Sequence, residues 1–270
     1  MKLSSKVLII AGSDSSGGAG IQADIKTVTA LGGYAMTAIT AVTAQNTKGI
    51  KNITPIPIQN VHKQITMILD DIGANAVKIG MLHNSSIIKC VYNIIKKYRL
   101  KNIVLDPVMV AKGGARLINN SSIKHLKKLL LPLCYLVTPN IPEAKVLTGY
   151  SISSKEDMIK AAKKILSMGP KNVLLKGGHL KNKMIFDILA TNKEIKIFRK
   201  RKIKTKNTHG TGCTLSSALA TCLSQKKNIV KSCETSMRYV HDAIASAPGY
   251  GKGFGPLNHL ISLNLRNTDV

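Results

Sequence analysis

The sequence predicts an α/β fold, a three-layer α/β/α sandwich around a mostly parallel central sheet. Short apolar runs alternate along the chain with longer segments whose apolar residues recur at helical spacing. Residues 7–11 are apolar throughout, which is typical of a strand that is covered on both faces. No internal repeat, linker or change in composition divides the 270 residues, so we expect a single domain spanning residues 1–270.

The apolar runs give a series of expected strands that ends in a hairpin. The strands are expected at residues 7–11, 34–42, 76–79, 103–105, 135–137 and 173–175, and the hairpin at residues 184–189 and 195–198. Helices are expected at about residues 20–31, 61–72, 87–95, 123–130, 158–166, 213–223 and 229–244. In such folds ligands bind beyond the carboxyl ends of the strands, so the residues that follow each strand are the most informative.

The charge of the chain is unusually positive. Lys and Arg number 40 against 13 Asp and Glu, a net charge of +27. The basic residues are spread along the chain, with one dense run at residues 199–204. Three Phe and no Trp leave few surfaces on which bases could stack. We therefore favour an anionic small-molecule substrate and expect no nucleic-acid partner, although a basic nucleic-acid-binding protein stays open as an alternative.

The cysteines and the apolar runs bear on the cellular compartment. The five cysteines, at positions 90, 134, 213, 222 and 233, are odd in number and have no CxxC spacing. They predict neither a disulfide framework nor a zinc cluster. No apolar run reaches the roughly 18 residues of a membrane span, and the first residues do not form a signal peptide. We expect a cytoplasmic protein with no membrane partner.

The segment from Asn207 to Thr214 predicts an anion-binding site. Its glycines and threonines lead directly into an apolar helical run. The backbone N–H groups of Gly210, Thr211 and Gly212 would then lie at the positive end of the helix dipole. Cys213 falls in the first helical turn, where we expect the pKa of a thiol to be lowered. On local grounds this segment would suit a kinase, a hydrolase or a redox enzyme.

The loop at residues 12–20 is rich in glycine and serine. It contains a loose match to the dinucleotide-binding fingerprint, but no acidic residue lies between Asp24 and Asp70 to hold a ribose. No P-loop motif occurs in the chain. We interpret the segment as a flexible loop, including Gly12, that lets backbone approach a ligand closely.

Two residues near this loop are candidate ligand donors. Asp24 shares a helical face with Ile21, Ile25 and Val28, so a carboxylate lies on an apolar stripe. It either interacts with its own helix end or pairs with a ligand donor, because an unpaired buried carboxylate is costly. Gln45 follows the second strand and could offer a neutral amide.

Polar residues also follow the later strands. Asp106 follows the strand at 103–105 and suits a Mg²⁺ shell. Asn140 and Glu143 stand three apart at a helix start, a spacing that a capping box would also explain. Lys176 places an ammonium group beside two glycines. Together with the 207–214 segment, these residues indicate Mg²⁺–nucleotide chemistry.

Long motifs, in order along the chain, then identify a family. The sequence AGSDSSGGAGIQAD at residues 11–24, KGGH at 176–179 and NTHGTGC at 207–213 resemble the hydroxymethylpyrimidine/phosphomethylpyrimidine kinases of thiamine biosynthesis, a branch of the ribokinase superfamily. The similarity also includes DPVM at 106–109 and GKGFGP at 251–256, and so it extends over nearly the whole chain.

The resemblance implies two successive ATP-dependent phosphorylations, of the pyrimidine's hydroxymethyl group and then of the monophosphate. It implies a ribokinase-like fold, a Mg²⁺ ion and commonly a homodimer. The implied pyrimidine pocket consists of Gly12, Asp24, Gln45, Met81 and Val108. The residues implied for Mg²⁺ and the ATP phosphates are Asp106, Asn140, Glu143, Lys176 and Thr208. Of these, Asp106 and Glu143 are the implied ligands of the metal. The implied anion hole consists of Gly210, Thr211, Gly212 and Cys213.

Cys213 departs from the wider superfamily, in which an Asp is the usual general base. A thiol has an unperturbed pKa of about 8.5, so as a thiolate it could accept the proton of a hydroxyl group. Cys213 and Lys176 are accordingly the expected catalytic side chains. A pyridoxal or pyridoxine kinase of the same superfamily is the nearest alternative, because its substrate is also a small ring with a hydroxymethyl group.

Overall fold

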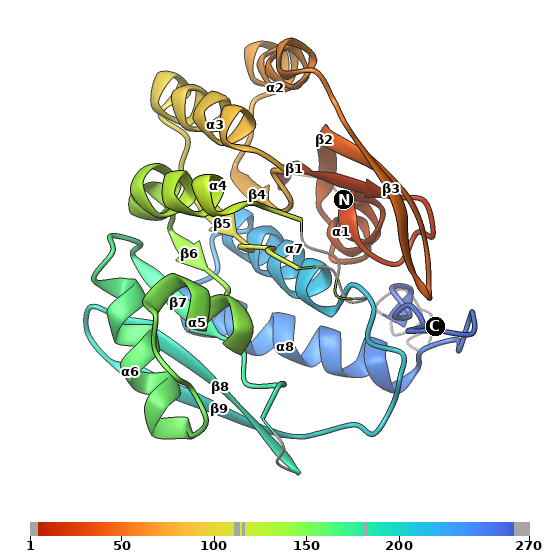
Figure 1. The fold of residues 1–270 in the computed structure, drawn as a ribbon, viewed down its shortest axis with the longest axis vertical. Coiled ribbons are helices and arrows are strands. Elements are labelled where there is room, and N and C mark those ends of the chain that lie inside the picture. The colour runs from red at the N-terminus through yellow and green to blue at the C-terminus, as the bar shows by residue number, and fades with distance from the viewer. Residues whose placement is uncertain (1–4, 111–113, 115–116, 181–182, 262–270) are drawn as a thin grey trace.

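A single sheet runs through the part of the chain that the computed structural model describes, residues 5–110, 114, 117–180 and 183–261. Its nine strands lie in the order β3-β2-β1-β4-β5-β6-β7-β8-β9 (Figure 1). The strands are β1 (Lys6–Asp14), β2 (Tyr34–Asn46), β3 (Gly49–Pro55), β4 (Ala76–Ile79), β5 (Ile103–Leu105), β6 (Leu136–Val137), β7 (Asn172–Leu175), β8 (Met184–Thr191) and β9 (Ile195–Arg201). The helices are α1 (Gly20–Ala30), α2 (Ile58–Asp71), α3 (Ser85–Tyr98), α4 (Asn120–His125), α5 (Ile141–Thr148), α6 (Lys155–Leu166), α7 (Thr211–Ser224) and α8 (Ile229–Ala245).

The centre of the sheet is parallel and its edges are antiparallel. Strands from β2 through β1, β4, β5 and β6 to β7 pair in parallel, whereas β3, β8 and β9 pair antiparallel. After β2 and β3 the chain crosses to the other side of β1 and continues with β4. The loops beyond β1 and β4 therefore leave in opposite directions, which opens a crevice at this point of the sheet.

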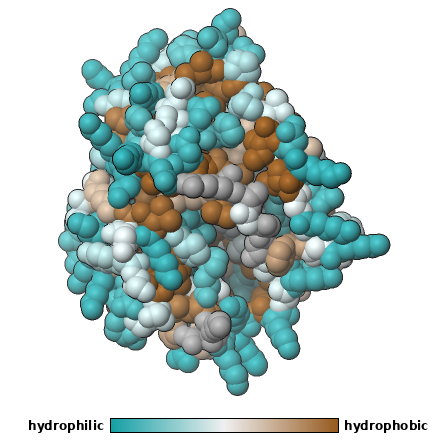
Figure 2. Space-filling view, in the orientation of Figure 1, coloured by the Kyte–Doolittle hydropathy of each residue, from teal (hydrophilic) through white to brown (hydrophobic). Residues whose placement is uncertain are grey.

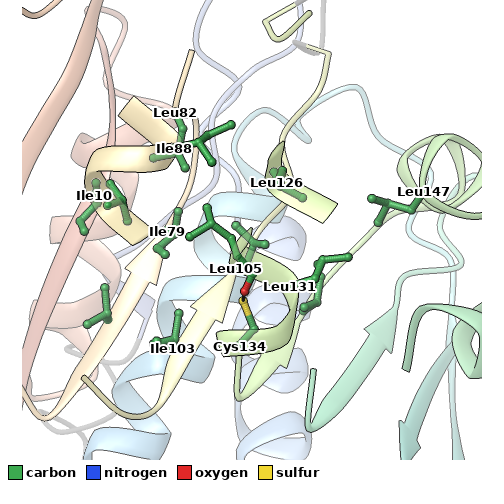
Figure 3. Close-up of a cluster of buried hydrophobic side chains, with 14 of the residues drawn as sticks. Ile10, Ile79, Leu82, Ile88, Ile103, Leu105, Leu126, Leu131, Cys134 and Leu147 are labelled. Carbon is green, nitrogen blue, oxygen red and sulfur yellow. Dashed lines mark hydrogen bonds between the residues drawn. The ribbon is translucent and has the colours of Figure 1, made fainter. Parts of the chain in front are cut away.

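Helices cover both faces of the sheet, as the continuously apolar strands require. In β1, Leu8 and Ile10 point to the face covered by α2 to α6, and Val7 and Ile9 point to the face covered by α1, α7 and α8 (Figure 1). Figure 3 shows part of the first cluster, in which the thiol of Cys134 donates a hydrogen bond to the carbonyl of Leu130 at 3.1 Å. The expected three-layer sandwich is confirmed.

Five of the eight helices named above begin with a side-chain cap, whereas α1, α2 and α7 do not. Asn84, Ser154 and Asn228 each accept a hydrogen bond from a backbone N–H in the first turn of their helix. The residues before α1 and α7 are Ala19 and Gly210, and neither side chain caps the helix. The first N–H groups of these two helices therefore have no partner from a capping side chain.

The largest difference from the expected elements lies at the β2 edge. Strand β2 continues to Asn46, so Gln45 lies within it rather than after it, and the strand β3 was not expected at all. β3 is largely exposed and polar, and it has no apolar alternation to predict it. It forms because its backbone pairs antiparallel with the extension of β2 across a short turn. Strand β1 likewise extends to Asp14, into the segment interpreted as a loop.

The surface shows the solvated charge that the composition suggested. Hydrophilic side chains cover most of the face drawn in Figure 2, with apolar side chains between them. The hairpin of β8 and β9, which includes part of the dense basic run, has the expected antiparallel pairing. Within the described ranges, no helix has both the length and the apolar character needed to cross a bilayer.

The core between the sheet and α3 to α6 allows a matched stability test. Leu105 is completely buried there (Figure 3), whereas Leu260 is 60% exposed. We expect Leu105→Ala to lower the free energy of unfolding by about 2–5 kcal/mol, because it removes buried contacts and leaves a cavity. Leu260→Ala should change it by less than about 0.5 kcal/mol. Urea denaturation followed by circular dichroism measures both, and equal losses would contradict the packing described.

Candidate active site

A cavity of about 770 Å³ opens at the carboxyl ends of the parallel strands, beside the crossing between β1 and β4. Nearly all the residues expected from the sequence line it. These are Gly12, Gln45, Met81, Asp106, Val108, Asn140, Glu143, Lys176, Thr208, Gly210, Thr211, Gly212 and Cys213. Asp24 is not among the lining residues. A second hollow, between α2 and α3, is lined by none of the expected residues.

The start of α7 has the geometry on which the prediction of an anion hole depends. Gly210 has a φ of 79°, in the left-handed region, and a Cβ there would run into the carbonyl of Gly18. Gly212 approaches two charged groups so closely that a Cβ would lie 3.1 Å from Asp106 Oδ2 and 3.3 Å from Lys176 Nζ. The uncapped helix start and an ammonium group therefore lie side by side, an arrangement suited to a phosphate.

Lys176 and Asp106 form an ion pair at this end of the cavity. Lys176 Nζ lies 2.8 Å from Asp106 Oδ1, and the same oxygen is 3.2 Å from the hydroxyl of Thr138. Burial alone would lower the pKa of Lys176, but the carboxylates of Asp106 and Glu143 outweigh it and raise the pKa. Lys176 is thus a permanent cation at neutral pH, as charge stabilisation of a phosphoryl group requires.

Asn140 and Glu143 form the capping box that their spacing allowed. The Asn140 side chain accepts a hydrogen bond from the Glu143 N–H at 2.9 Å, and Glu143 Oε2 accepts one from the Asn140 N–H at 2.8 Å. Burial raises the pKa of Glu143 to about 7, against the opposing effect of Lys176. The nearby Asp106 contributes to the rise. Both residues cap α5 and line the cavity as well.

Asp106 and Glu143 fit the requirements of a magnesium ion. Mg²⁺ prefers oxygen ligands, and it commonly takes one or two carboxylates together with phosphate oxygens and water. In the described part of the chain, no group of three or more His, Cys, Asp or Glu side chains could hold a metal by itself. If a magnesium ion binds here, Asp106 and Glu143 would be its protein ligands, together with nucleotide phosphates and water.

A histidine and an aspartate that were not expected as site residues join the two glycine-rich segments. His209 Nε2 lies 2.7 Å from Asp14 Oδ2 and 3.3 Å from Gln45 Nε2, and all three residues line the cavity. Burial would raise the pKa of Asp14, but hydrogen bonds from His209 and Ser16 outweigh it and lower the pKa to about 2. Asp14 and His209 each lie within a glycine-rich motif of the sequence, and this position could have indicated that they are site residues.

The expectation for Asp24 is wrong in one respect: its carboxylate cannot contact a pyrimidine directly. The side chain is fully buried, with Oδ2 2.6 Å from Lys78 Nζ and Oδ1 2.7 Å from Ser217 Oγ. Lys78 lines the cavity instead. This lysine was missed as a site residue, although a lysine within the apolar run of β4 was a signal, because a buried ammonium group requires a partner.

The expected lowering of the Cys213 pKa is also wrong for the protein without substrates. Burial raises the pKa of this thiol to about 11, the ammonium group of Lys78 opposes the rise, and the carboxylates of Asp24 and Asp106 add to it. Cys213 is therefore a neutral thiol at rest. The other four cysteines are buried and unpaired, and burial raises the pKa of each, as expected of core residues.

Comparison with known proteins identifies the family. The sequence model described as phosphomethylpyrimidine kinase matches residues 14–258. The chain belongs to this family. It is 44% identical over 255 residues to the hydroxymethylpyrimidine/phosphomethylpyrimidine kinase of Bacillus subtilis, with 94% of each chain covered. It is 48% identical to the thiamine biosynthesis bifunctional protein ThiED of Geobacter sulfurreducens, where the match covers 95% of this chain and 52% of the relative, about half its length.

Solved structures agree with this assignment and show the ribokinase-like fold. The phosphomethylpyrimidine kinase of Clostridium difficile superposes with a TM-score of 0.80 and 43% identity, over 89% of this chain and 99% of that one. An ADP complex of Bacillus subtilis pyridoxal kinase superposes with a TM-score of 0.89 and 35% identity, over 97% and 99%. As a member of the phosphomethylpyrimidine kinase family, the chain is a phosphotransferase that uses ATP.

The pair of Asp14 and His209 gives a prediction for the dependence of stability on pH. The pKa of Asp14 is lower in the fold, at about 2, than its ordinary value of 3.8, so its ionised form stabilises the fold. This stabilisation is fully present above the ordinary pKa and is lost as the pH falls through the folded one. We expect Asp14→Asn to lower the free energy of unfolding at neutral pH, with the difference from wild type shrinking as the pH falls from about 4 to about 2.

Denaturant unfolding over this pH range measures the effect. Asp71→Asn is the matched control, because Asp71 is exposed on α2. A difference between wild type and Asp14→Asn that stays constant across the range would contradict the role given to the ionised carboxylate.

Proposed function

We propose that the chain phosphorylates 4-amino-5-hydroxymethyl-2-methylpyrimidine in two steps, first to the monophosphate and then to the diphosphate, with ATP as donor. The observation that carries this proposal is the uncapped start of α7 beside Lys176 and Asp106, in a cavity at the strand crossing. The family and the names of its relatives support thiamine biosynthesis as the setting.

The two ends of the cavity suit the two substrates. The phosphate end contains Lys176, Asp106 and the anion hole described above. The other end has an apolar wall in which Met81 and Leu117 pack with the half-buried Val108. A Cβ on Gly12 would lie 2.6 Å from the terminal methyl group of Met81, so a larger residue there would require this flexible side chain to shift. Such a wall suits one face of a pyrimidine ring, and Gln45 offers the ring an amide.

The side chains divide the chemistry between positioning and charge. Lys176 and the N–H groups of Gly210 to Cys213 stabilise the negative charge on the transferring phosphoryl group. Cys213, after its thiol has released its proton to solvent, accepts the proton of the hydroxymethyl group in the first step. The acceptor of the second step is already an anionic phosphate and requires no base. A magnesium ion held by Asp106 and Glu143 would neutralise charge on the nucleotide phosphates.

Pyridoxal phosphorylation is the second candidate activity. The pyridoxal kinases of Bacillus subtilis and Staphylococcus aureus superpose with TM-scores of 0.89 and 0.88, at 35% and 33% identity. The structure of the Staphylococcus aureus enzyme contains AMP-PCP and pyridoxal. The pyrimidine kinases compared above have higher identities, 44% for Bacillus subtilis and 43% for Clostridium difficile, which favours the pyrimidine.

The proposal includes a homodimer that works in the cytoplasm and needs no nucleic acid. The resemblance of the motifs supports the homodimer. The five unpaired cysteines support a reducing compartment. The positive charge is spread over an otherwise solvated surface, which favours small anionic substrates over a long polyanion.

A coupled assay of ADP release tests the substrate assignment. We expect turnover with the hydroxymethylpyrimidine and with its monophosphate, and a much lower kcat/KM with pyridoxal. Mass spectrometry of the products should show the monophosphate before the diphosphate. Turnover of pyridoxal alone would refute the pyrimidine assignment. Nucleic-acid retention that falls with salt, without any ATP turnover, would refute the kinase assignment altogether.

Replacing Cys213 should separate the two steps. We expect Cys213→Ala to lower kcat of the first phosphorylation by about 10²-fold, the usual contribution of a general base, and to change the second by a much smaller factor. Cys222→Ala is the matched control, because this cysteine lies on the same helix but in the core. Equal losses in both steps would assign Cys213 to the anion hole alone.

A further inference from the structure

Beneath Cys213 lies a fully buried ion pair that the chemistry described so far does not use. Lys78 on β4 and Asp24 on α1 are both inaccessible to solvent, and Lys78 Nζ lies 2.6 Å from Asp24 Oδ2. The other carboxylate oxygen of Asp24 accepts a hydrogen bond from Ser217 on α7 at 2.7 Å. Strand β4 and the helices α1 and α7 are thus joined at one point, immediately behind the cavity wall.

The geometry directs the positive end of this pair toward the reacting groups. Lys78 lines the cavity, and neither Asp24 nor Ser217 does. Ser217 follows Cys213 by four residues on α7, so the two lie on the same face, one turn apart. A Cβ on Gly80 would lie only 2.8 Å from Lys78 Nζ, so the glycine leaves room beside the ammonium group. Asp24, which does not line the cavity, anchors a lysine that does.

Stability alone does not account for this pair. Two charges taken out of water lose hydration, and apolar side chains of similar size commonly stabilise a fold at least as well. A buried ion pair whose cation lines an active-site cavity therefore suggests a chemical role. Lys176 pairs with Asp106 at the phosphate end, whereas Lys78 is the cation whose charge lowers the pKa of the Cys213 thiol.

We propose that Lys78 is a positioning residue for the first phosphorylation, in which its ammonium group, anchored by Asp24, holds one negative charge on Cys213 and the acceptor oxygen. In this step Cys213 acts as a thiolate, because its own proton has first passed to solvent. The sulfur then takes the hydroxymethyl proton, and the O–H electron pair forms the new bond to the γ-phosphorus. The bond from phosphorus to ADP breaks, and its electron pair leaves with ADP. A single negative charge is shared by sulfur and oxygen while the proton moves, and a fixed cation nearby stabilises it.

The charges around Cys213 are consistent with this role. Lys78 on β4 is the main group that lowers the pKa of the thiol, against its burial. Asp24 on α1 and Asp106 after β5 act in the opposite direction, and the thiolate in turn raises the pKa of Lys176 after β7. In the second step the acceptor phosphate is anionic already, so the charge that Lys78 supports in the first step is not needed.

This inference rests on the proposed function, and the experiment distinguishes the two. Wild-type turnover of the pyrimidine and of its monophosphate is measured first, because a lack of both would refute the function rather than the role of Lys78. Lys78→Met is then compared with the double variant Lys78→Met/Asp24→Asn. The single change leaves a buried carboxylate unpaired and should lower the denaturation midpoint, whereas the double change removes both charges and should restore much of it.

The activity of each variant should depend on whether the Lys78 ammonium group is present, and not on how stable the variant is. We expect kcat of the first step to fall at least roughly tenfold in both the single and the double variant, about the effect of losing one transition-state interaction. The kcat of the second step, which does not use this interaction, should change by less than about threefold. Ser217→Ala is the matched control, because it removes a hydrogen bond from Asp24 and keeps both charges. Recovery of the first step in the double variant, or equal losses in both steps, would overturn the proposal.

A second measurement needs no substrate. The rate at which iodoacetamide alkylates Cys213, followed by mass spectrometry of its peptide, reports the thiolate fraction. We expect the pH profile of this rate to move to higher pH in Lys78→Met and to show no such move in Asp24→Asn. An unchanged profile in Lys78→Met would overturn the proposal even if the variant is less stable than wild type.

Discussion

The burial of α7 is the constraint on which the site depends. Every residue of this helix from Thr214 to Ser224 is buried, so its start must meet the cavity at a fixed place. Gly210 precedes it without a side-chain cap, and a Cβ there would strike Gly18. The first N–H groups of the helix therefore lack side-chain partners from the cap, and a phosphate supplies the partners that such a helix start otherwise takes from water or a cap.

Two lysine–aspartate pairs then give the cavity its charge. Lys176 pairs with the cavity-lining Asp106, while Lys78 lines the cavity and pairs with Asp24, which does not line it. Burial disfavours each ammonium group, but the carboxylates outweigh it, and both lysines keep raised pKa values. The carboxylates thus keep two cations charged inside a low-dielectric site, where a fixed charge acts most strongly.

The sequence was sufficient for the parallel centre of the sheet, and nearly all the site residues it predicted line the cavity, because apolar periodicity and the glycine-rich motifs are local. It missed β3, whose polar residues form a strand only by pairing with β2. It also missed the Lys78–Asp24 pair, whose members are 54 residues apart and meet only in the fold. The prediction of a lowered pKa for Cys213 was wrong for a related reason. The helix start is a local feature of the sequence, but the burial that raises the pKa of this thiol depends on the whole molecule.

The choice between a pyrimidine and a pyridoxal substrate depends on a different part of the cavity. Both rings carry a hydroxymethyl group, so Lys176 and the start of α7 would serve either one equally. Discrimination must come from the apolar wall of Met81, Leu117 and Val108 and from the polar groups that face the ring. Removing a hydrogen-bonding partner from a buried polar group costs more than changing apolar contacts. We therefore expect Gln45, a polar residue that lines the cavity beside His209, to distinguish the two substrates more strongly than the apolar wall does.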